Sequence, residues 1–480
     1  MWILEEGQIL PYLRSHYPVF DQSGPVDIQC IGALEGEEKP REPDEGGLIN
    51  YIFRVSNGKQ SVIVKQGRSA SRKNDKIVLP IWRNRQEYET LRLRHAIVPQ
   101  YTPETYYVDW ENAIFLMEDV SDLAQVRKLL CSGVMLPRLA EQVGEFVAAS
   151  TFYCSEFYLE ADLFRRLSAR FRNSDMRSIM EDWVFLRDAP YLTHNGNPVL
   201  KQLIDRDESI RVCCYELRHK FMTRGEALIH GDLHTSNVFA DEERLKVIDM
   251  EYTFAGPLCY DIGYFAASLL TQYCTACFRP FPSEGARRTF LSYLLSSLLE
   301  LYYSFVEHFT EFWREDAKPI YQRSGGFCEH LARGFLPDVL GFAAVPCFPQ
   351  ITTSLTPEFA QLDGKARGQA HELCLVLSRY LLLERERWDT MEDAVQAIGD
   401  FSATTAGGLD REPTSSELQG AILGYGLSNI IGAVLGCLPT ATYSQNVGIV
   451  GSTRVIARRG FSASAVILLI AGLIPKFSAL

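Results

Sequence analysis

The sequence predicts a two-lobed α+β fold that is followed by a helical tail of membrane type. The longest β-rich runs lie before residue 120, whereas helical spacing dominates from 123 to 313. After about residue 390 the composition shifts to few acids, many glycines and long apolar stretches. We therefore expect a sheet-containing domain at 1–120, a mainly helical domain at 121–390 and a distinct segment at 391–480.

The first lobe is predicted from its strands. The runs 48–55 and 61–66 are rich in β-branched and aromatic residues, and Asn57-Gly58 between them is typical of a hairpin. Residues 83–95 have a helix-forming composition, and Glu87 is placed to pair with Lys65, with Glu89 as the alternative. A further apolar strand begins at Ile114 and breaks into acids at Glu118 and Asp119.

The second lobe is predicted from helical periodicity. Residues 123–157, 163–180 and 290–313 have apolar positions three and four apart. The last run places six large side chains on one face, which we interpret as a core stripe: Leu291, Leu294, Leu295, Leu298, Leu299 and Tyr302.

The most informative segment lies between residues 228 and 265. It contains His-Gly-Asp-Leu-His at 230–234, Asp-Met-Glu at 249–251 and Asp-Ile-Gly at 261–263. Phosphoryl transfer needs a carboxylate beside the attacking hydroxyl and oxygen ligands that hold Mg²⁺ against the triphosphate. Asp232 suits the first role, and the oxygens of Asn237, Asp249 and Glu251 suit the second. The alternative, a loop with ordinary capping residues, would require all three motifs to be ordered by accident.

This order of motifs resembles the aminoglycoside phosphotransferase and choline kinase superfamily, and within it the methylthioribose kinases. The resemblance implies a two-lobed, protein-kinase-like fold over about residues 1–390. It also implies ATP and Mg²⁺ as cofactors and transfer of phosphate to the 1-hydroxyl of 5-methylthioribose, a step of methionine salvage.

The resemblance also implies roles for single residues. Asn50 would lie at the nucleotide, and Lys65 would pair with the α- and β-phosphates. Backbone groups of Glu118 and Val120, on either side of Asp119, would meet adenine at the hinge. Three consecutive residues would hold the metal-bound nucleotide, with a methionine where the family has proline: Asp249, Met250 and Glu251.

Two departures from the family pattern concern the glycine-rich loop, which is Asp44-Glu45-Gly46-Gly47 here, and an arginine pair. The second departure, together with Asn237, leaves the acceptor open. Methylthioribose kinases carry an arginine pair after an apolar Gly-Phe-Ala stretch, whereas this chain has Pro349-Gln350 after Gly341-Phe342-Ala343. Asn237 corresponds to the asparagine of aminoglycoside and choline kinases, where methylthioribose kinases often have serine. The acceptor is therefore either methylthioribose or another small alcohol of the choline or aminoglycoside kind.

The segment 392–480 resembles a central fragment of the xanthine and uracil nucleobase permeases. Gln445-Asn446 begins the signature Gln-Asn-x-Gly-x-x-x-x-Thr-Arg, and in that family these two amides would lie at the purine site. Apolar stretches at 421–438 and 461–474 predict two or three helices and membrane association through 418–480. A whole transporter needs more spanning helices, so we expect no transport. The alternatives are a membrane-tethered kinase, a joining of neighbouring genes, and a catalytically silent fusion with a binding or membrane-attachment role.

Charge and cysteine content limit the partners. The formal net charge of −12 disfavours nonspecific binding to nucleic acid, so the expected partner is a small sugar. The 12 cysteines include no second pair to match Cys274-x-x-Cys277, which favours free thiols in a reducing compartment over zinc or disulfides. We expect the kinase portion to be cytoplasmic. The sequence leaves open whether it forms a homodimer.

Overall fold

The computed structural model describes residues 2–31, 50–69, 78–186, 197–352 and 356–408. The chain separates into two compact units, residues 1–391 and 392–480. In the second unit the described part is residues 392–408, which belong to the helix α17 (Met391–Gly408). The predicted permease-like features, including Gln445 and Asn446 and both apolar stretches, lie outside the described residues.

The first lobe is built on an antiparallel sheet with the strand order β1-β2-β3-β5-β4. The predicted hairpin is confirmed: β2 pairs with β3, and Gly58 in the connection has a φ of +82°, which glycine adopts without strain. The strands are β1 (Asp27–Ile31), β2 (Tyr51–Ser56), β3 (Ser61–Gln66), β4 (Thr105–Asp109) and β5 (Ile114–Glu118).

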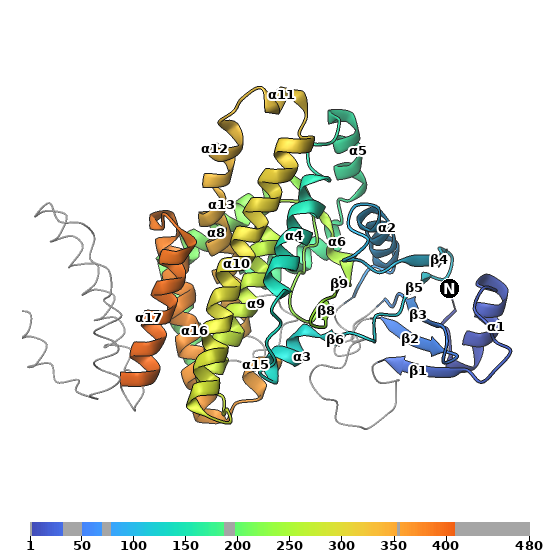
Figure 1. The fold of residues 1–480 in the computed structure, drawn as a ribbon, viewed down its shortest axis with the longest axis horizontal. Helices are drawn as coiled ribbons and strands as arrows, with labels where there is room; N and C mark the ends of the chain where they lie inside the picture. Colours follow the sequence, from blue (N-terminus) through green and yellow to red (C-terminus); the bar gives the residue numbers. More distant parts are fainter. Residues whose placement is uncertain (1, 32–49, 70–77, 187–196, 353–355, 409–480) are drawn as a thin grey trace, which may run out of the picture. The chain divides into compact units, whose positions relative to one another are not determined.

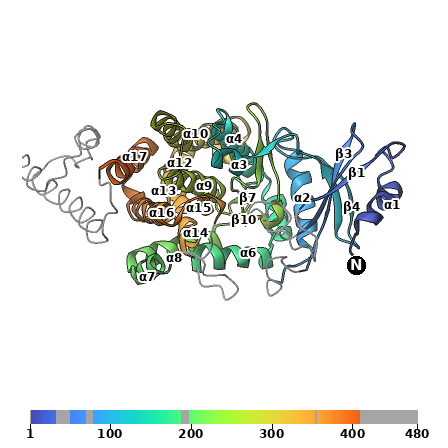
Figure 2. The same ribbon diagram turned by 90° about the horizontal axis from the view of Figure 1, so that it is seen from below.

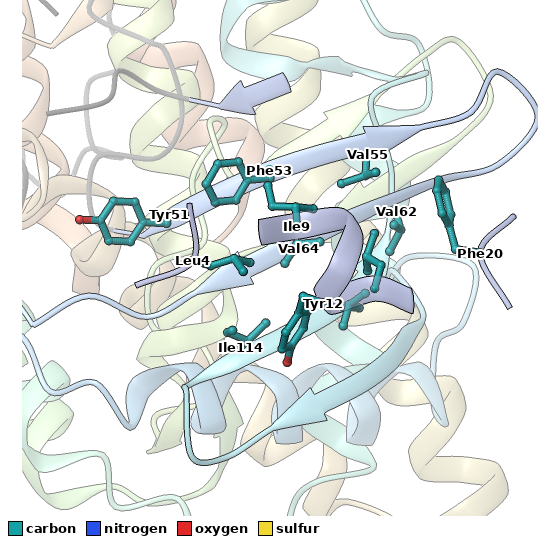
Figure 3. Close-up of a cluster of buried hydrophobic side chains, with 12 residues drawn as sticks. Leu4, Ile9, Tyr12, Phe20, Tyr51, Phe53, Val55, Val62, Val64 and Ile114 are labelled. Carbon is teal, nitrogen blue, oxygen red and sulfur yellow. The ribbon is translucent and has the colours of Figure 1, made fainter. Parts of the chain in front are cut away.

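Two helices cover the two faces of this sheet (Figure 2). Because side chains alternate along β2, Tyr51, Phe53 and Val55 point to one face, where α1 (Glu6–His16) packs on them. Figure 3 shows the resulting apolar cluster, which extends from Leu4, before α1, to Ile114 on β5. The other face is covered by α2 (Arg83–His95), with the bounds that the sequence predicts.

The second lobe is mainly helical (Figure 1). Short strands and a 3-10 turn carry its loops, namely β6 (Ala124–Gln125), β7 (Ala227–Ile229), β8 (Val238–Ala240), β9 (Leu245–Val247), β10 (Phe254–Gly256) and η2 (Met250–Tyr252). The helices are α3 (Val126–Cys131), α4 (Leu139–Phe152), α5 (Ala161–Arg170), α6 (Ser174–Met180), η1 (Glu181–Leu186), α7 (Pro198–Arg206), α8 (Glu208–Thr223), α9 (Tyr260–Ala276), α10 (Glu284–Asp316), α11 (Pro319–Gln322), α12 (Phe327–Arg333), α13 (Phe335–Ala344), α14 (Cys347–Thr352), α15 (Pro357–Ala360), α16 (Gly364–Glu384) and η3 (Arg385–Arg387).

Two of the predicted helical runs are interrupted. The run 123–157 begins with β6 and divides into α3 and α4 around Gly133, whose φ is +80°. The run 163–180 divides at Asn173, which adopts a left-handed conformation with a φ of +48°. The apolar spacing continues across both breaks, so periodicity alone predicts one helix in each place.

The third predicted run is confirmed as part of α10, but its buried face is rotated from the predicted one. Leu294, Leu298 and Tyr302 are buried as expected, whereas Leu291, Leu295 and Leu299 are only half-buried. The buried stripe continues instead through residues on the following turns of the same face: Leu301, Phe305, Phe309 and Trp313.

One helical run, Phe327–Thr352, is long and apolar enough to cross a membrane by length and composition. Within the structure 72% of its most apolar window is buried, as expected for the core helices of a folded lobe. Gly263 of α9 lies at its crossing with α13, where an added Cβ would meet the Phe342 Cβ at 2.5 Å. The run Phe327–Thr352 is therefore explained by packing inside the kinase-like unit.

Candidate functional site

The loop after β7 positions Asp232. Gly231 has a φ of +84°, and a Cβ there would meet the Tyr252 carbonyl oxygen at 2.6 Å, so glycine is required at this turn. The Asp261 carboxylate accepts hydrogen bonds from the N–H groups of His230 (2.5 Å) and Gly231 (2.9 Å). These bonds fix the loop to the first turn of α9, where Asp261 lies.

His230 fixes the same loop to Ile248, the residue after β9. Its Nε2 lies 3.0 Å from the Ile248 carbonyl oxygen, and the side chain is fully buried. Burial, reinforced by the nearby Arg94 guanidinium, lowers the pKa of His230 to about 3. The imidazole is therefore neutral at physiological pH, and its role is to hold the loop rather than to carry charge.

Asp232 contacts His234 through its side chain and Asn237 through its main chain. His234 Nε2 is 3.5 Å from Asp232 Oδ2, and the Asn237 side-chain amide donates to the Asp232 carbonyl oxygen at 2.9 Å. Asn237 is buried. Burial raises the pKa of Tyr264 on α9 well above its usual range, and the Asp232 carboxylate adds to the rise. A hydroxyl substrate entering here would meet a carboxylate surrounded by polar side chains.

Three carboxylates meet where the two lobes face each other. Oxygen atoms of Glu87, Asp249 and Glu251 all lie within 4.8 Å of one another. Asp249 follows β9 in a left-handed conformation with a φ of +64°, and Glu251 follows on η2. Hard oxygen donors at this spacing match the chemistry of Mg²⁺, so the residues present fit this metal. Among the predicted metal ligands, Asp249 and Glu251 belong to this group.

Lys65 lies between two of these carboxylates. Its ammonium donates to Glu87 (2.8 Å) and to Asp249 (2.7 Å), and its side chain is only 4% exposed. The structure thus places Glu87, rather than Glu89, beside Lys65; Glu89 pairs with Arg85 and Arg170. Burial and the two neighbouring carboxylates raise the pKa of Glu87 to about 8, although Lys65 opposes the rise.

Asn50 and Glu251 have a partner that sequence reasoning does not single out. The Arg83 guanidinium is fully buried, donates through Nε to Glu251 Oε2 (3.0 Å) and through Nη2 to Asn50 Oδ1 (2.5 Å). Asn50 Nδ2 donates to the same Glu251 oxygen at 3.3 Å. Burial raises the pKa of Glu251, and Asp249 adds to the rise, while Arg83 opposes it. The sequence signal that could have found Arg83 is its position four residues before Glu87, on the same side of the predicted helix.

The predicted hinge follows β5. The Asp119 carboxylate accepts from Arg54 Nε at 2.6 Å and from the Ser121 N–H, so its side chain braces the strand end. Glu118 donates its N–H to the Glu104 carbonyl oxygen. Among the described residues no hydrogen bond is found for the Val120 N–H. A backbone donor that binds adenine must be unpaired within the protein in this way.

Comparison with known proteins shows the relatives of this chain. Residues 41–278 match the model of the phosphotransferase enzyme family. The methylthioribose kinase of Geobacillus sp. (strain WCH70) is 34% identical over 395 residues, which cover 78% of this chain and 94% of that protein. The methylthioribose kinase of Geobacillus thermodenitrificans (strain NG80-2) is 34% identical over 370 residues, which cover 74% and 89%.

The chain belongs to the methylthioribose kinase family. Its α+β fold, with a small sheet lobe and a helical lobe, is the protein-kinase-like fold predicted from the sequence. Among solved structures, choline kinase from Cryptosporidium parvum Iowa II has a TM-score of 0.43 and 14% identity, covering 82% of this chain and 98% of that one. This likeness adds no argument about the acceptor.

The segment 390–480 matches the model of the permease family, as the sequence signature indicates. Most of this match, residues 409–480, lies outside the described residues. The predicted membrane association has no support within the described part of the chain.

The family pattern leads us to expect an arginine pair where this chain has Pro349-Gln350. At that place Gln350 Oε1 accepts a hydrogen bond from the Thr271 hydroxyl at 2.9 Å, and Pro349 is buried. Another guanidinium, that of Arg127, is close enough to Tyr264 to oppose the rise of its pKa. The Arg127 N–H donates to the Thr235 carbonyl oxygen, and its side chain pairs with the buried Glu358 at 2.9 Å.

Proposed function

We propose that the protein transfers the γ-phosphoryl group of MgATP to a sugar hydroxyl, most specifically the 1-hydroxyl of 5-methylthioribose. The observation that supports the proposal is that the loop carrying Asp232 lies against Tyr252, the residue after Glu251 of the carboxylate cluster. The carboxylates of Glu251, Asp232 and Asp249 all help to raise the pKa of Tyr252, after burial as the main cause. The family relationship supports the choice of sugar, since both relatives described above are named methylthioribose kinases.

The proposed reaction needs little covalent chemistry from the protein. The acceptor oxygen forms a bond to the γ-phosphorus, the bond from that phosphorus to the bridging oxygen of ADP breaks, and Asp232 accepts the hydroxyl proton. Lys65 has three N–H donors, and its bonds to Glu87 and Asp249 leave one that can meet a phosphate oxygen.

Asp249, Glu251 and Asn237 are the residues proposed to hold Mg²⁺. The ion would neutralise negative charge on the phosphates when it is bound. The proposed nucleotide contacts are Asn50, the hinge backbone from Glu118 to Val120, and the residues around Met250.

A second candidate is a kinase for a different small alcohol. It is favoured by one observation, the Thr271–Gln350 hydrogen bond in the place of an arginine pair. A polar site that lacks its guanidinium discriminates poorly among sugars, so choline-like or aminoglycoside-like acceptors remain the competing class.

The deciding experiment measures ADP release by the full-length protein with ATP, Mg²⁺ and, in turn, methylthioribose, choline and an aminoglycoside. We expect the highest kcat/KM with methylthioribose. Asp232→Asn should lower kcat by about 10² to 10⁴-fold, because the variant cannot accept the proton.

Asp241→Asn is the matched control, since Asp241 lies on the exposed β8–β9 turn and should leave kcat unchanged. Turnover of choline or the aminoglycoside alone would select the second candidate. Turnover of none of the three, with nucleotide binding absent, would favour a catalytically silent fusion.

A further inference from the structure

Arg83 and Glu87 occupy successive turns of α2 and reach the same acidic cluster. Glu87 meets Lys65, while Arg83 meets Glu251 on the opposite lobe, 168 residues away in sequence. A different nitrogen of the same guanidinium, Nη1, donates to the carbonyl oxygens of Arg68 (2.5 Å) and Pro80 (3.1 Å). Because its remaining donors are fixed in one plane, the orientation of its Nε–H toward Glu251 is fixed as well.

The contacts with Glu251 are not spread over the carboxylate. Arg83 Nε and Asn50 Nδ2 both donate to Oε2, at 3.0 and 3.3 Å. Among the described residues no hydrogen bond is found to Oε1, although the Glu251 side chain is only 1% exposed. A structural ion pair alone would be satisfied by two parallel bonds to both oxygens, whereas this arrangement leaves one oxygen for another partner.

Charge adds a second argument. Two cations, Lys65 and Arg83, face the carboxyl groups of Glu87, Asp249 and Glu251. Glu87 and Glu251 are buried, whereas the Asp249 side chain is partly exposed. Lys65 contacts Glu87 and Asp249, so Arg83 is the cation that compensates Glu251. Without it, the buried Glu251 carboxylate would face the charged Asp249 carboxylate with no cation in contact, which burial makes costly.

We propose that Arg83 is a positioning residue that, together with Asn50, holds Glu251 by one oxygen and so presents the other to the divalent metal of the nucleotide complex. This inference rests on the proposed function. It goes beyond that function by assigning the metal affinity of Glu251 to a residue that itself touches neither metal nor substrate.

The test uses the full-length protein and follows Mn²⁺ by the electron paramagnetic resonance signal of the free ion, in the presence of ADP. Arg83→Met should weaken Mn²⁺ binding by about 10 to 100-fold, as loss of a group that orients a metal ligand typically does. Arg83→Lys, which keeps the charge but not the planar fork, should fall between this variant and the parent. The KM for the acceptor should stay within about twofold, because only the metal side is altered.

Arg85→Met is the matched control. Arg85 lies on the same helix, its side chain is 59% exposed, and it pairs with Glu89 away from the cluster. Its loss should leave Mn²⁺ affinity unchanged.

A double-mutant cycle gives a second test, and Arg83→Lys, which keeps a cation beside Glu251, replaces Arg83→Met in it if Arg83→Met folds poorly. Glu251→Gln and Glu251→Gln combined with Arg83→Met should bind Mn²⁺ equally, since Arg83 acts only through the Glu251 carboxylate. Parental Mn²⁺ affinity in Arg83→Met, or a further loss in the double variant, would overturn the inference. The Mn²⁺ readout needs no acceptor, so failure of the proposed sugar specificity is distinguished from failure of the inference.

Discussion

The Asp261 carboxylate has a role that only the folded chain reveals. It is 1% exposed and accepts both N–H groups that precede Asp232. In Asp261→Asn one of the two acceptor oxygens becomes an NH₂ donor facing an N–H, so the loop must shift. Since displacement of a reacting group by about 1 Å can cost about 10²-fold, we expect kcat to fall by that order.

Steady-state kinetics check this prediction, with circular dichroism to show that the variant is folded. Asp207→Asn is a suitable control. The Asp207 carboxylate also accepts backbone N–H groups, but those of the first turn of α8 and not those of the Asp232 loop. A parental kcat in Asp261→Asn would show that the two hydrogen bonds from His230 and Gly231 to Asp261 are dispensable.

His371 gives a pH-dependent prediction at the same scale. The side chain is buried against Phe359, and burial together with Arg367 lowers its pKa from 6.5 to about 4. The unfolded chain therefore binds this proton first, and stability is lost as the pH falls from about 6.5 toward 4. His371→Leu lacks this loss. Between pH 7 and pH 5 the unfolding free energy of the parent should therefore fall by about 2 kcal/mol more than that of the variant.

Urea unfolding of both proteins at pH 7 and pH 5 measures that difference. Taking the difference cancels the titration of all groups that the two proteins share. A difference that stays constant with pH would mean that His371 titrates alike in the folded and unfolded chains.

At the scale of helices, the crossing of α9 with α13 depends on Gly263. An added Cβ would meet the Phe342 Cβ at 2.5 Å and the Val339 carbonyl oxygen at 2.9 Å. We expect Gly263→Ala to destabilise the protein by about 1 to 3 kcal/mol, the usual cost of overpacking, as measured by urea unfolding.

Gly368→Ala is the matched comparison, because Gly368 lies within α16 and has no atom within 4 Å of an added Cβ. There alanine should stabilise the helix by about 0.5 to 1 kcal/mol. Equal effects of the two substitutions would show that close packing at the crossing is not what selects glycine.

These elements also show what could be predicted from the sequence. The β2–β3 hairpin and α2 follow from local signals, Asn57-Gly58 and a helix-forming composition, and are found as predicted. The breaks at Gly133 and Asn173 were missed because the apolar spacing runs on through them. The pairing of Arg83 with Glu251 joins residues from both lobes, and no spacing along the chain encodes such a contact.

At the scale of the whole kinase-like unit, the candidate site is assembled from both lobes. Lys65 and Glu87 come from the sheet lobe, and Asp249 and Glu251 come from the helical lobe. A ligand that binds this cluster in the folded state only must stabilise the fold as a unit.

MgADP at 100 times its dissociation constant should therefore raise the unfolding free energy by about 2.7 kcal/mol. Thermal unfolding with MgADP, and with ADP plus a chelator, measures the share that depends on the metal. Asp249→Asn should remove most of this share, whereas Asp241→Asn should retain it. Equal stabilisation with and without chelator would contradict the proposed role of the carboxylates.

The packing of α1 on the sheet bears on how the chain is synthesised. The cluster in Figure 3 joins Leu4 and Ile9 to Ile114, so it cannot close until more than a hundred residues have been made. While the ribosome is still translating the intervening segment, Phe53 and Val55 have no complete cover and are exposed to chaperones. The shortest nascent chain able to fold this lobe must therefore contain both α1 and β5.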